Sequence, residues 1–403
     1  MSKLQDLINR LCPNGVEYIK LKYISQIGTG SSDKKDAVSD GQYPFFVRSK
    51  NIERHNHFEY NEEAVIIPGE GGIGEIFHYI NGPYALHQRV YRIHFTDRRI
   101  ITKYAYYYLY NHFKKFIAAK AVNATVTSIR KPMIEEFPLA VPPIEVQEEI
   151  VKILDRFAEY AAELQAELQA RKEQYEYYRN LLLSFNPSAS DDEPTLTTWG
   201  GHSYKIAWKT MGEIGKFIRG NGLQKKDFTD SGVGCIHYGQ IYTHYGTFAT
   251  ETKSFVNSKL AERLLRVRPG DIILACTSEN VEDVGKAVAW LGNEDIVTGG
   301  HSVVFKHSEN PKFIAYFLQT RLFFQQKKKY AYGAKVIDIK TEDLAKILIP
   351  IPPLELQEKI VAILDRFETL VNDLTQGLPA EIAAVREQYE YYRNKLLTFK
   401  QLA

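Results

Sequence analysis

Cysteine is scarce in this sequence of 403 residues, and the three that occur, Cys12, Cys235 and Cys276, are widely separated. No pair has the Cys-x-x-Cys spacing of a structural zinc site, and an odd number of scattered thiols does not suit a disulfide framework. We therefore expect a cytoplasmic protein, kept in a reducing compartment, with no metal site and no disulfide.

Long apolar runs are also missing. The sequence has no stretch of about eighteen consecutive apolar residues, so it predicts no membrane span. Residues 1–15 alternate leucine and isoleucine with polar side chains, which is typical of a short amphipathic helix and not of a signal peptide. The net charge of +2 is too small to indicate a nucleic-acid partner by itself.

Catalytic motifs are absent as well. There is no phosphate-binding Gly-x-x-x-x-Gly-Lys-Ser/Thr loop, no His-Glu-x-x-His, and no Asn-Pro-Pro-aromatic motif of an adenine methyltransferase. Gly69, Gly71 and Gly74 match the Gly-x-Gly-x-x-Gly of dinucleotide-binding proteins, but the residues that follow predict strand and turn, not helix. A turn is the better interpretation, and the sequence predicts no catalytic residue.

Two blocks of sequence occur twice. Residues 142–157 read PPIEVQEEIVKILDRF and residues 352–367 read PPLELQEKIVAILDRF, while EQYEYYRN stands at 173–180 and again at 387–394. Agreement of this kind predicts a duplicated architecture in which each copy carries a long helix.

Each copy also has the apolar spacing of a coiled-coil seam. Apolar side chains recur in steps of three and four, so each helix presents one stripe to a partner helix. The predicted seam contains Ile150, Leu154, Phe157, Leu164, Leu168, Tyr175, Tyr178 and Leu182 in the first copy, and Ile360, Leu364, Phe367, Tyr389, Tyr392 and Leu396 in the second. The obvious partner of one stripe is the other. Gly377 and Pro379 predict a local break in the second copy, with Pro379 restarting the helix.

The domain organisation follows from the duplication. We expect an α+β fold with two mixed α/β domains, joined by two long helices that form an antiparallel intramolecular coiled coil. The predicted segments are a first domain at 1–141, a first long helix at 142–185, a linker at 186–199, a second domain at 200–351 and a second long helix at 352–403. Within the domains, 85–93 predicts a strand, and 299–305 predicts its counterpart.

Several loops in each domain carry side chains suited to nucleic acid. Lysine and arginine bind phosphate or guanine, asparagine and glutamine pair with adenine, and aromatic rings stack on bases. Basic runs at 97–131 and 311–337 support a polyanionic partner. The candidates are Lys34, Lys35, Arg48, Lys50, Asn51, His87, Gln88 and Arg89 in the first domain, and Arg219, Asn221, Gln224, Lys225, Lys226, Tyr238, Gln240, Thr277, Ser278, His301 and Lys335 in the second. His87 and His301 occupy comparable places, and a packed or DNA-facing role suits them better than general-base catalysis.

The duplicated Pro-Pro, Glu-x-x-Gln-Glu-x-Ile-Val, Leu-Asp-x-Phe and Gln-Tyr-x-Tyr-Tyr-Arg pattern, with a variable domain before each copy, resembles the DNA specificity subunits of type I restriction-modification enzymes. The resemblance covers essentially the whole chain. It implies two target-recognition domains that each read one half of a bipartite, asymmetric site in double-stranded DNA. It also implies two docked methyltransferase subunits and restriction subunits as partners, which would carry S-adenosylmethionine, ATP and Mg²⁺, so that this chain needs no cofactor.

Two alternatives to a DNA specificity subunit remain open. One is a duplicated coiled-coil scaffold whose domains bind protein partners, and the other is an enzyme whose active site has no recognisable motif. One detail favours the specificity subunit: residues 161–168 read AAEL followed by QAEL, similar to the tetrapeptide repeat that one branch of the family places between its recognition domains. Four helical residues add about 6 Å, so the repeat number should set the spacing of the half-sites.

Overall fold

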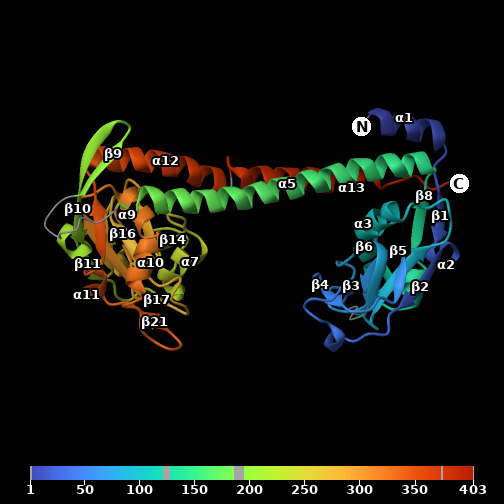
Figure 1. Cartoon of the computed structure of the whole chain (residues 1–403), viewed down its shortest axis with the longest axis horizontal. Coiled ribbons are helices and arrows are strands. Elements are labelled where there is room, and N and C mark those ends of the chain that lie inside the picture. Colours follow the sequence, from blue (N-terminus) through green and yellow to red (C-terminus); the bar gives the residue numbers. More distant parts are fainter. Residues whose placement is uncertain (1, 121–127, 186–194, 374, 403) are drawn as a thin grey trace. The chain divides into compact units, whose positions relative to one another are not determined.

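The computed structural model describes residues 2–120, 128–185, 195–373 and 375–402. It divides into two compact units: unit 1 contains Met1–Glu163 and Ile382–Ala403, and unit 2 contains Leu164–Glu381. Each unit therefore joins one globular domain to a part of both duplicated helical segments (Figure 1). Most of the predicted linker, 186–194, lies outside the described residues.

The elements of unit 1 are α1 (Ser2–Leu11), β1 (Glu17–Lys20), α2 (Leu21–Ile24), β2 (Ser25–Thr29), η1 (Lys34–Asp36), β3 (Tyr43–Phe46), β4 (Ile52–His55), β5 (Tyr60–Pro68), β6 (His78–Leu86), β7 (Val90–Phe95), α3 (Thr102–Lys120), α4 (Lys131–Glu135) and β8 (Pro138–Val141). Helix α5 (Ile144–Leu182) begins in unit 1 and ends in unit 2, and α13 (Leu378–Leu396) begins in unit 2 and ends in unit 1.

The elements of unit 2 are β9 (Thr195–Trp199), β10 (His202–Thr210), α6 (Met211–Ile214), β11 (Gly215–Arg219), η2 (Lys225–Asp227), β12 (Val233–Ile236), α7 (Tyr238–Thr243), β13 (Phe248–Ala249), β14 (Ser254–Val256), α8 (Ser258–Ala261), β15 (Leu265–Val267), β16 (Ile272–Ala275), β17 (Thr277–Ser278), β18 (Ala287–Trp290), β19 (Ile296–Thr298), β20 (Ser302–His307), α9 (Pro311–Phe317), α10 (Arg321–Lys327), β21 (Ile337–Asp338), α11 (Thr341–Leu344), β22 (Leu348–Ile351) and α12 (Leu354–Asn372).

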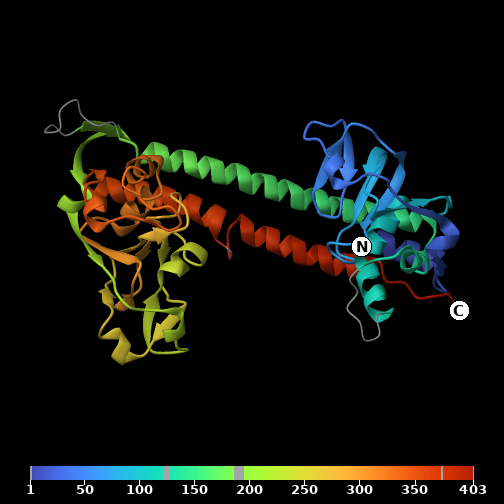
Figure 2. The same cartoon turned by 90° about the horizontal axis from the view of Figure 1, so that it is seen from below.

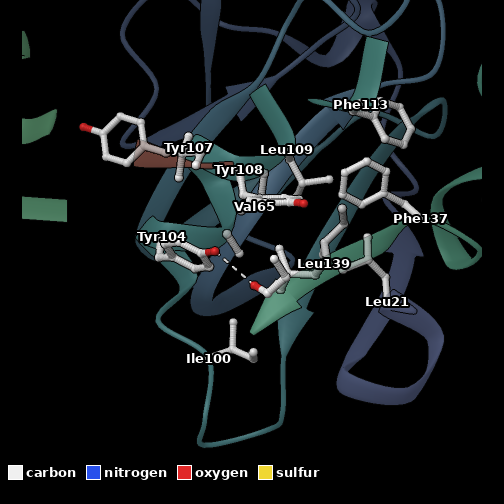
Figure 3. Close-up of a cluster of buried hydrophobic side chains, with 14 of the residues drawn as sticks. Leu21, Val65, Ile100, Tyr104, Tyr107, Tyr108, Leu109, Phe113, Phe137 and Leu139 are labelled. Carbon is white, nitrogen blue, oxygen red and sulfur yellow. Dashed lines mark hydrogen bonds between the residues drawn. The ribbon is translucent and has the colours of Figure 1, made fainter. Parts of the chain in front are cut away.

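A six-stranded sheet of order β2-β7-β5-β6-β3-β4 forms the centre of unit 1. Its pairs are antiparallel except β3 with β6. Helix α3 packs on it because tyrosine, leucine and phenylalanine recur on one helical face. Figure 3 shows Tyr104 and Tyr108 of this helix near Val65 of β5, and Phe113 packed on Phe137 with ring centroids 5.4 Å apart. The buried Tyr104 hydroxyl donates to the carbonyl of Ala140 at 3.0 Å, which ties α3 to β8.

Unit 2 repeats the core of this topology with two sheets. Their strand orders are β11-β20-β16-β18-β13 and β14-β12-β19-β15. The parallel pairing of β12 with β19 corresponds to that of β3 with β6, and η2 and η1 both have the sequence Lys-Lys-Asp. The mixed α and β fold with long helices confirms the predicted fold class.

The long helices pair inside each unit (Figure 2). In unit 1, Ile150 and Leu154 of α5 share a buried cluster with Leu396 of α13, and the next seam residue, Phe157, stacks on Tyr392 with ring centroids 5.6 Å apart. Residues later in α5 therefore contact residues earlier in α13, so the two helices are antiparallel. In unit 2 the rings of Tyr175 and Tyr178 stack on Phe367 of α12.

Three expectations about strands need correction. The segment 85–93 is not one strand: β6 ends at Leu86 and β7 begins at Val90, because the Arg89 N–H donates to His87 Nδ1 at 3.0 Å and closes a turn. Its counterpart at 299–301 is likewise a turn, between β19 and β20. The end of the predicted linker is strand β9, whose residues Thr195–Trp199 pair with β10.

The second long helix is two helices. α12 ends at Asn372 and α13 begins at Leu378, as Gly377 and Pro379 predicted, but the helix does not extend to residue 403 because α13 ends at Leu396. A side chain at Gly377 would lie 2.3 Å from the carbonyl oxygen of Thr369, so this tight turn requires glycine. Leu402 instead donates its N–H to Val16 of unit 1.

Candidate nucleic-acid interface

The candidate loops of the first domain meet at one end of its sheet. In the register, Pro68 at the end of β5 faces Val90 at the start of β7, and Phe46 at the end of β3 lies beside Leu86 at the end of β6. The segments that follow or precede these residues, 47–51, 69–75 and 87–89, therefore converge. They are loops, where binding side chains are commonly placed by a rigid sheet.

The structure exposes most of the predicted residues of this domain. Exposed are Lys34, Lys35, Arg48, Lys50, Asn51, Gln88 and Arg89. His87 is different, since only 2% of it is exposed, and its ring accepts the Arg89 N–H. Burial lowers the pKa of His87, which favours the neutral ring that this hydrogen bond requires. His87 thus positions Arg89.

A residue that the sequence interpretation missed lies among these side chains. The Glu70 carboxylate accepts from Arg48 Nη1 at 2.8 Å and from Arg89 Nη1 at 3.1 and 3.2 Å. Lys34, Arg48, Glu70 and His87 also line a pocket of about 280 Å³. The signal in the sequence was a lone acid between glycines, Gly-Glu-Gly-Gly, in a domain whose other candidates are basic or neutral.

The candidate loops of the second domain converge in the same way. Ala275 at the end of β16 faces Ser302 at the start of β20, and Ile236 at the end of β12 lies beside Thr298 at the end of β19. Arg219, Asn221, Gln224, Lys225, Lys226, His301 and Lys335 are exposed, and Tyr238, Gln240 and Ser278 are half-buried. Lys335 precedes β21, which pairs with β17 and so brings its loop to the same edge.

Gln240 and Thr277 are hydrogen-bonded within the domain, Gln240 through its side chain and Thr277 through its main-chain carbonyl. Gln240 accepts the His237 N–H at 3.0 Å and donates to Ser254 Oγ at 2.7 Å, while Thr277 is buried and its carbonyl accepts from the Tyr242 hydroxyl. Both residues therefore hold the loops rather than present a free group. A pocket of about 460 Å³ opens beside them, lined by polar and aromatic residues that include Tyr238, Tyr242, Ser278 and Asn280.

Lys327 is hydrogen-bonded to the main chain of the loop at 277–286. It is only 4% exposed, and its ammonium donates to the carbonyls of Glu282 and Val284 at 2.8 and 2.5 Å. Burial lowers the pKa of Lys327 to about 8. The basic run at 311–337 favours a polyanionic partner, but Lys327 of this run is buried and points into the domain.

The duplicated blocks dock each domain on its helices through the same contacts. Asp365 of α12 accepts from Lys312 Nζ and the Tyr316 hydroxyl, both at 2.7 Å. Gln147 and Gln357 are fully buried, and their amides bind the carbonyls of Pro142 and Pro352. The duplicated blocks are thus explained by domain docking. Each domain is attached to its helices by the same contacts, although the loops of the two domains differ in sequence.

All predicted seam residues are buried or half-buried: Ile150, Leu154, Leu164, Leu168, Tyr175, Ile360, Leu364 and Leu396 are buried, and Phe157, Tyr178, Leu182, Phe367, Tyr389 and Tyr392 are half-buried. Tyr177 and Tyr391 stand at the same position of the EQYEYYRN block and are 62% and 60% exposed. The repetition of an exposed ring on both copies marks a surface that the helix pairing does not explain.

The model of the type I restriction modification DNA specificity domain matches residues 13–173 and again 205–384. The chain belongs to this family. Membership makes it a DNA specificity subunit of a type I restriction-modification system, and it argues against the alternative of a scaffold for protein partners.

Known specificity subunits extend the match. The chain is 29% identical over 311 residues to the EcoR124I/EcoR124II specificity subunit of Escherichia coli, covering 75% of this chain and 72% of that one. It is 27% identical over 379 residues to a type I specificity subunit of Haemophilus influenzae, covering 89% of each.

Solved structures share the fold of this specificity subunit. The S subunit of M. genitalium aligns with a TM-score of 0.54 at 15% identity over 94% of this chain and 96% of that one. A chain from a study of complex assembly in the type I R-M system aligns with 0.58 at 14% identity, over 96% and 98%. Within the described residues, no helix has the length and apolarity that a bilayer span needs, and no three histidine, cysteine or acidic side chains group as metal ligands.

Proposed function

We propose that this specificity subunit is the non-catalytic DNA reader of its complex. The first domain reads one half of a bipartite, asymmetric site through the loops around Arg48 and Arg89. The second domain reads the other half through the loops around Arg219 and Tyr238. The observation that carries this proposal is that two domains docked by the same contacts present different side chains at equivalent loops.

Two methyltransferase subunits dock on the helices in this proposal. Tyr177 and Tyr391 occupy the same position in the two copies and both are exposed, so two molecules of the same partner can bind through the same kind of surface. The methyltransferase subunits supply S-adenosylmethionine and take up the target adenine, and restriction subunits supply ATP-dependent translocation and cleavage with Mg²⁺. Nothing in the loops of this chain is required to perform chemistry.

Co-expression tests the proposal. The chain and the methyltransferase of its system are produced together, and single-molecule sequencing reads the methylated motif. We expect a bipartite motif that changes when this chain is exchanged and no methyl transfer by this chain alone. Binding of the complex to DNA should weaken steeply with salt, since phosphate contacts release counterions. Salt-independent binding, or methyl transfer by the isolated chain, would contradict the proposal.

A further inference from the structure

We propose that Arg48, Glu70 and Arg89 act together to read one G·C base pair in the half-site of the first domain. This inference rests on the proposed function and deepens it, because it names the base pair that this cluster selects. It starts from the position of Glu70, whose carboxylate is shared by two arginines from two other loops.

The backbone places Glu70 between the arginines. The N–H of Gly69 donates to the carbonyl of Arg89 at 2.9 Å, and a side chain at Gly69 would lie 2.9 Å from that oxygen. A side chain at Gly71 would lie 2.5 Å from the carbonyl oxygen of Arg48, and Gly71 also has a φ of +80°. Both glycines are therefore needed for the loop to approach its two neighbours. This close approach explains two of the glycines in the Gly-x-Gly-x-x-Gly match without a bound dinucleotide.

The carboxylate decides which DNA group the arginines can bind. Hydrogen bonds from Arg48 and then Arg89 lower the pKa of Glu70, so it is ionised at neutral pH. A phosphate bound by these arginines would lie within a few ångströms of this negative charge and would be repelled by it. A guanine edge carries no charge, so the arginines can reach its O6 and N7 without this penalty.

The same carboxylate fits the other base of the pair. The N4 amino group of cytosine is a hydrogen-bond donor in the major groove, and carboxylates accept from it. The side chains of Arg48, Arg89 and Glu70 are 41%, 59% and 34% exposed, so all three can reach a ligand. Their mutual hydrogen bonds fix the arginine forks before DNA arrives, which reduces the side-chain entropy lost on binding.

The second domain has no equivalent cluster among its described residues. The loop after β16, which corresponds to the Glu70 loop, presents Ser278, Glu279 and Asn280, and Arg219 is paired with Asp338 alone at 3.1 Å. The inference therefore concerns one half-site only, and the other half-site serves as an internal reference in the experiment.

The test uses the full chain with the methyltransferase of its system and reads the methylated motif by single-molecule sequencing. We expect Arg89→Ala and Arg48→Ala to reduce discrimination at one G·C position of one half-site by roughly 5- to 150-fold, the equivalent of one bidentate contact. We expect Glu70→Gln to relax the same position and to strengthen binding to unrelated duplex DNA with a steeper salt dependence, because the freed arginines can bind phosphates.

The matched control is Arg99→Ala. Arg99 is 58% exposed and paired with Asp97, but it follows β7 whereas Arg89 precedes it, so it lies at the opposite end of the strand. We expect an unchanged motif. Preserved reading of the other bases of the first half-site shows that the first domain is folded in each variant.

Two results would overturn the inference. A uniform loss of methylation in both arginine variants, with the motif intact, would assign the arginines to phosphates. A Glu70→Gln variant with unchanged motif and salt dependence would remove the carboxylate from recognition. A wild-type chain that directs no sequence-specific methylation would instead contradict the proposed function itself, and the inference would fall with it.

Discussion

The carboxylate of Asp155 in α5 accepts a hydrogen bond from the hydroxyl of Tyr107 in α3 at 2.6 Å, and Lys103 completes the contact at 2.8 Å. This links the long helix of the duplicated block to the helix that covers the sheet. Asp365 makes the same two contacts in unit 2. The Leu-Asp-x-Phe motif is therefore a docking motif, in which aspartate holds the domain and phenylalanine holds the partner helix.

Removal of this contact should loosen one unit without affecting the other. We expect Asp155→Ala to destabilise unit 1 by roughly 1.5–3 kcal/mol, because two hydrogen bonds to a charged group are lost. Hydrogen exchange should show reduced protection in α3. Glu167→Ala on the same helix removes only an exposed pair with Arg171 and should cost less than about 1 kcal/mol. Equal loss of protection in both units would contradict this interpretation.

The exposed tyrosines predict partner stoichiometry. Tyr177→Ala and Tyr391→Ala should leave stability within about 0.5 kcal/mol, since both rings are largely in solvent. Each single variant should weaken the binding of one methyltransferase subunit by roughly tenfold or more, and the double variant should affect both. Native mass spectrometry of the complex measures this. Tyr23→Ala, at a 73% exposed tyrosine outside the duplicated blocks, is the control. Undiminished binding in the double variant would rule this surface out.

The tetrapeptide repeat predicts the spacing of the half-sites. Deletion of residues 165–168 shortens α5 by four residues, about 6 Å along the helix axis, which corresponds to one to two base-pair steps. We expect the methylated motif to keep both half-sites and to lose one or two unspecified bases between them. An extra copy of the same four residues should lengthen the spacer. If the spacer length stays the same in both variants, the helix does not set it.

Lys327 predicts a dependence of stability on pH. Its pKa is about 8 in the folded protein and about 10.4 in an unfolded chain, so the unfolded state binds more protons between these values. The free energy of unfolding contributed by this group should therefore rise with pH above 8, by roughly 3 kcal/mol in total.

Urea unfolding of the wild type and of Lys327→Met at pH 7.5, 8.5 and 9.5 tests this dependence. The free energy of unfolding of the wild type should increase relative to that of the variant as the pH rises. All three pH values lie below the usual pKa of tyrosine, so tyrosine ionisation does not dominate the change. A difference that is independent of pH would show that the ammonium carries no burial penalty.

The sequence predicted the parts of the fold that repeat. The heptad spacing located the seam, and Pro379 with Gly377 located the break between α12 and α13. The turn at His87–Arg89 was missed because His87, Gln88 and Arg89 continue a strand-like run, and the hydrogen bond from Arg89 N–H to His87 Nδ1 is visible only in three dimensions. Strand β9 was missed because its threonines follow a segment rich in proline and acids.

The residue types of the candidate loops can be read from the sequence, but their arrangement cannot. The basic and amide side chains of the loops are mostly exposed, as expected, yet the sequence gives no measure of which loops meet. Glu70 is 19 residues from Arg89 and 22 from Arg48, and only the antiparallel pairing of β5 with β7 and the parallel pairing of β3 with β6 bring the three together. Contacts of this kind depend on strand order, which local patterns do not encode.

Among the described residues, the buried amides of Gln147 and Gln357 bind main-chain groups alone, apart from a hydrogen bond from Gln357 to Glu309. Because these glutamines bind mainly main-chain groups, their hydrogen bonds can persist when side chains of the attached domain are substituted. The reading loops can therefore change without loss of this contact, whereas the contacts of Asp155 and Asp365 require a lysine and a tyrosine in the attached domain.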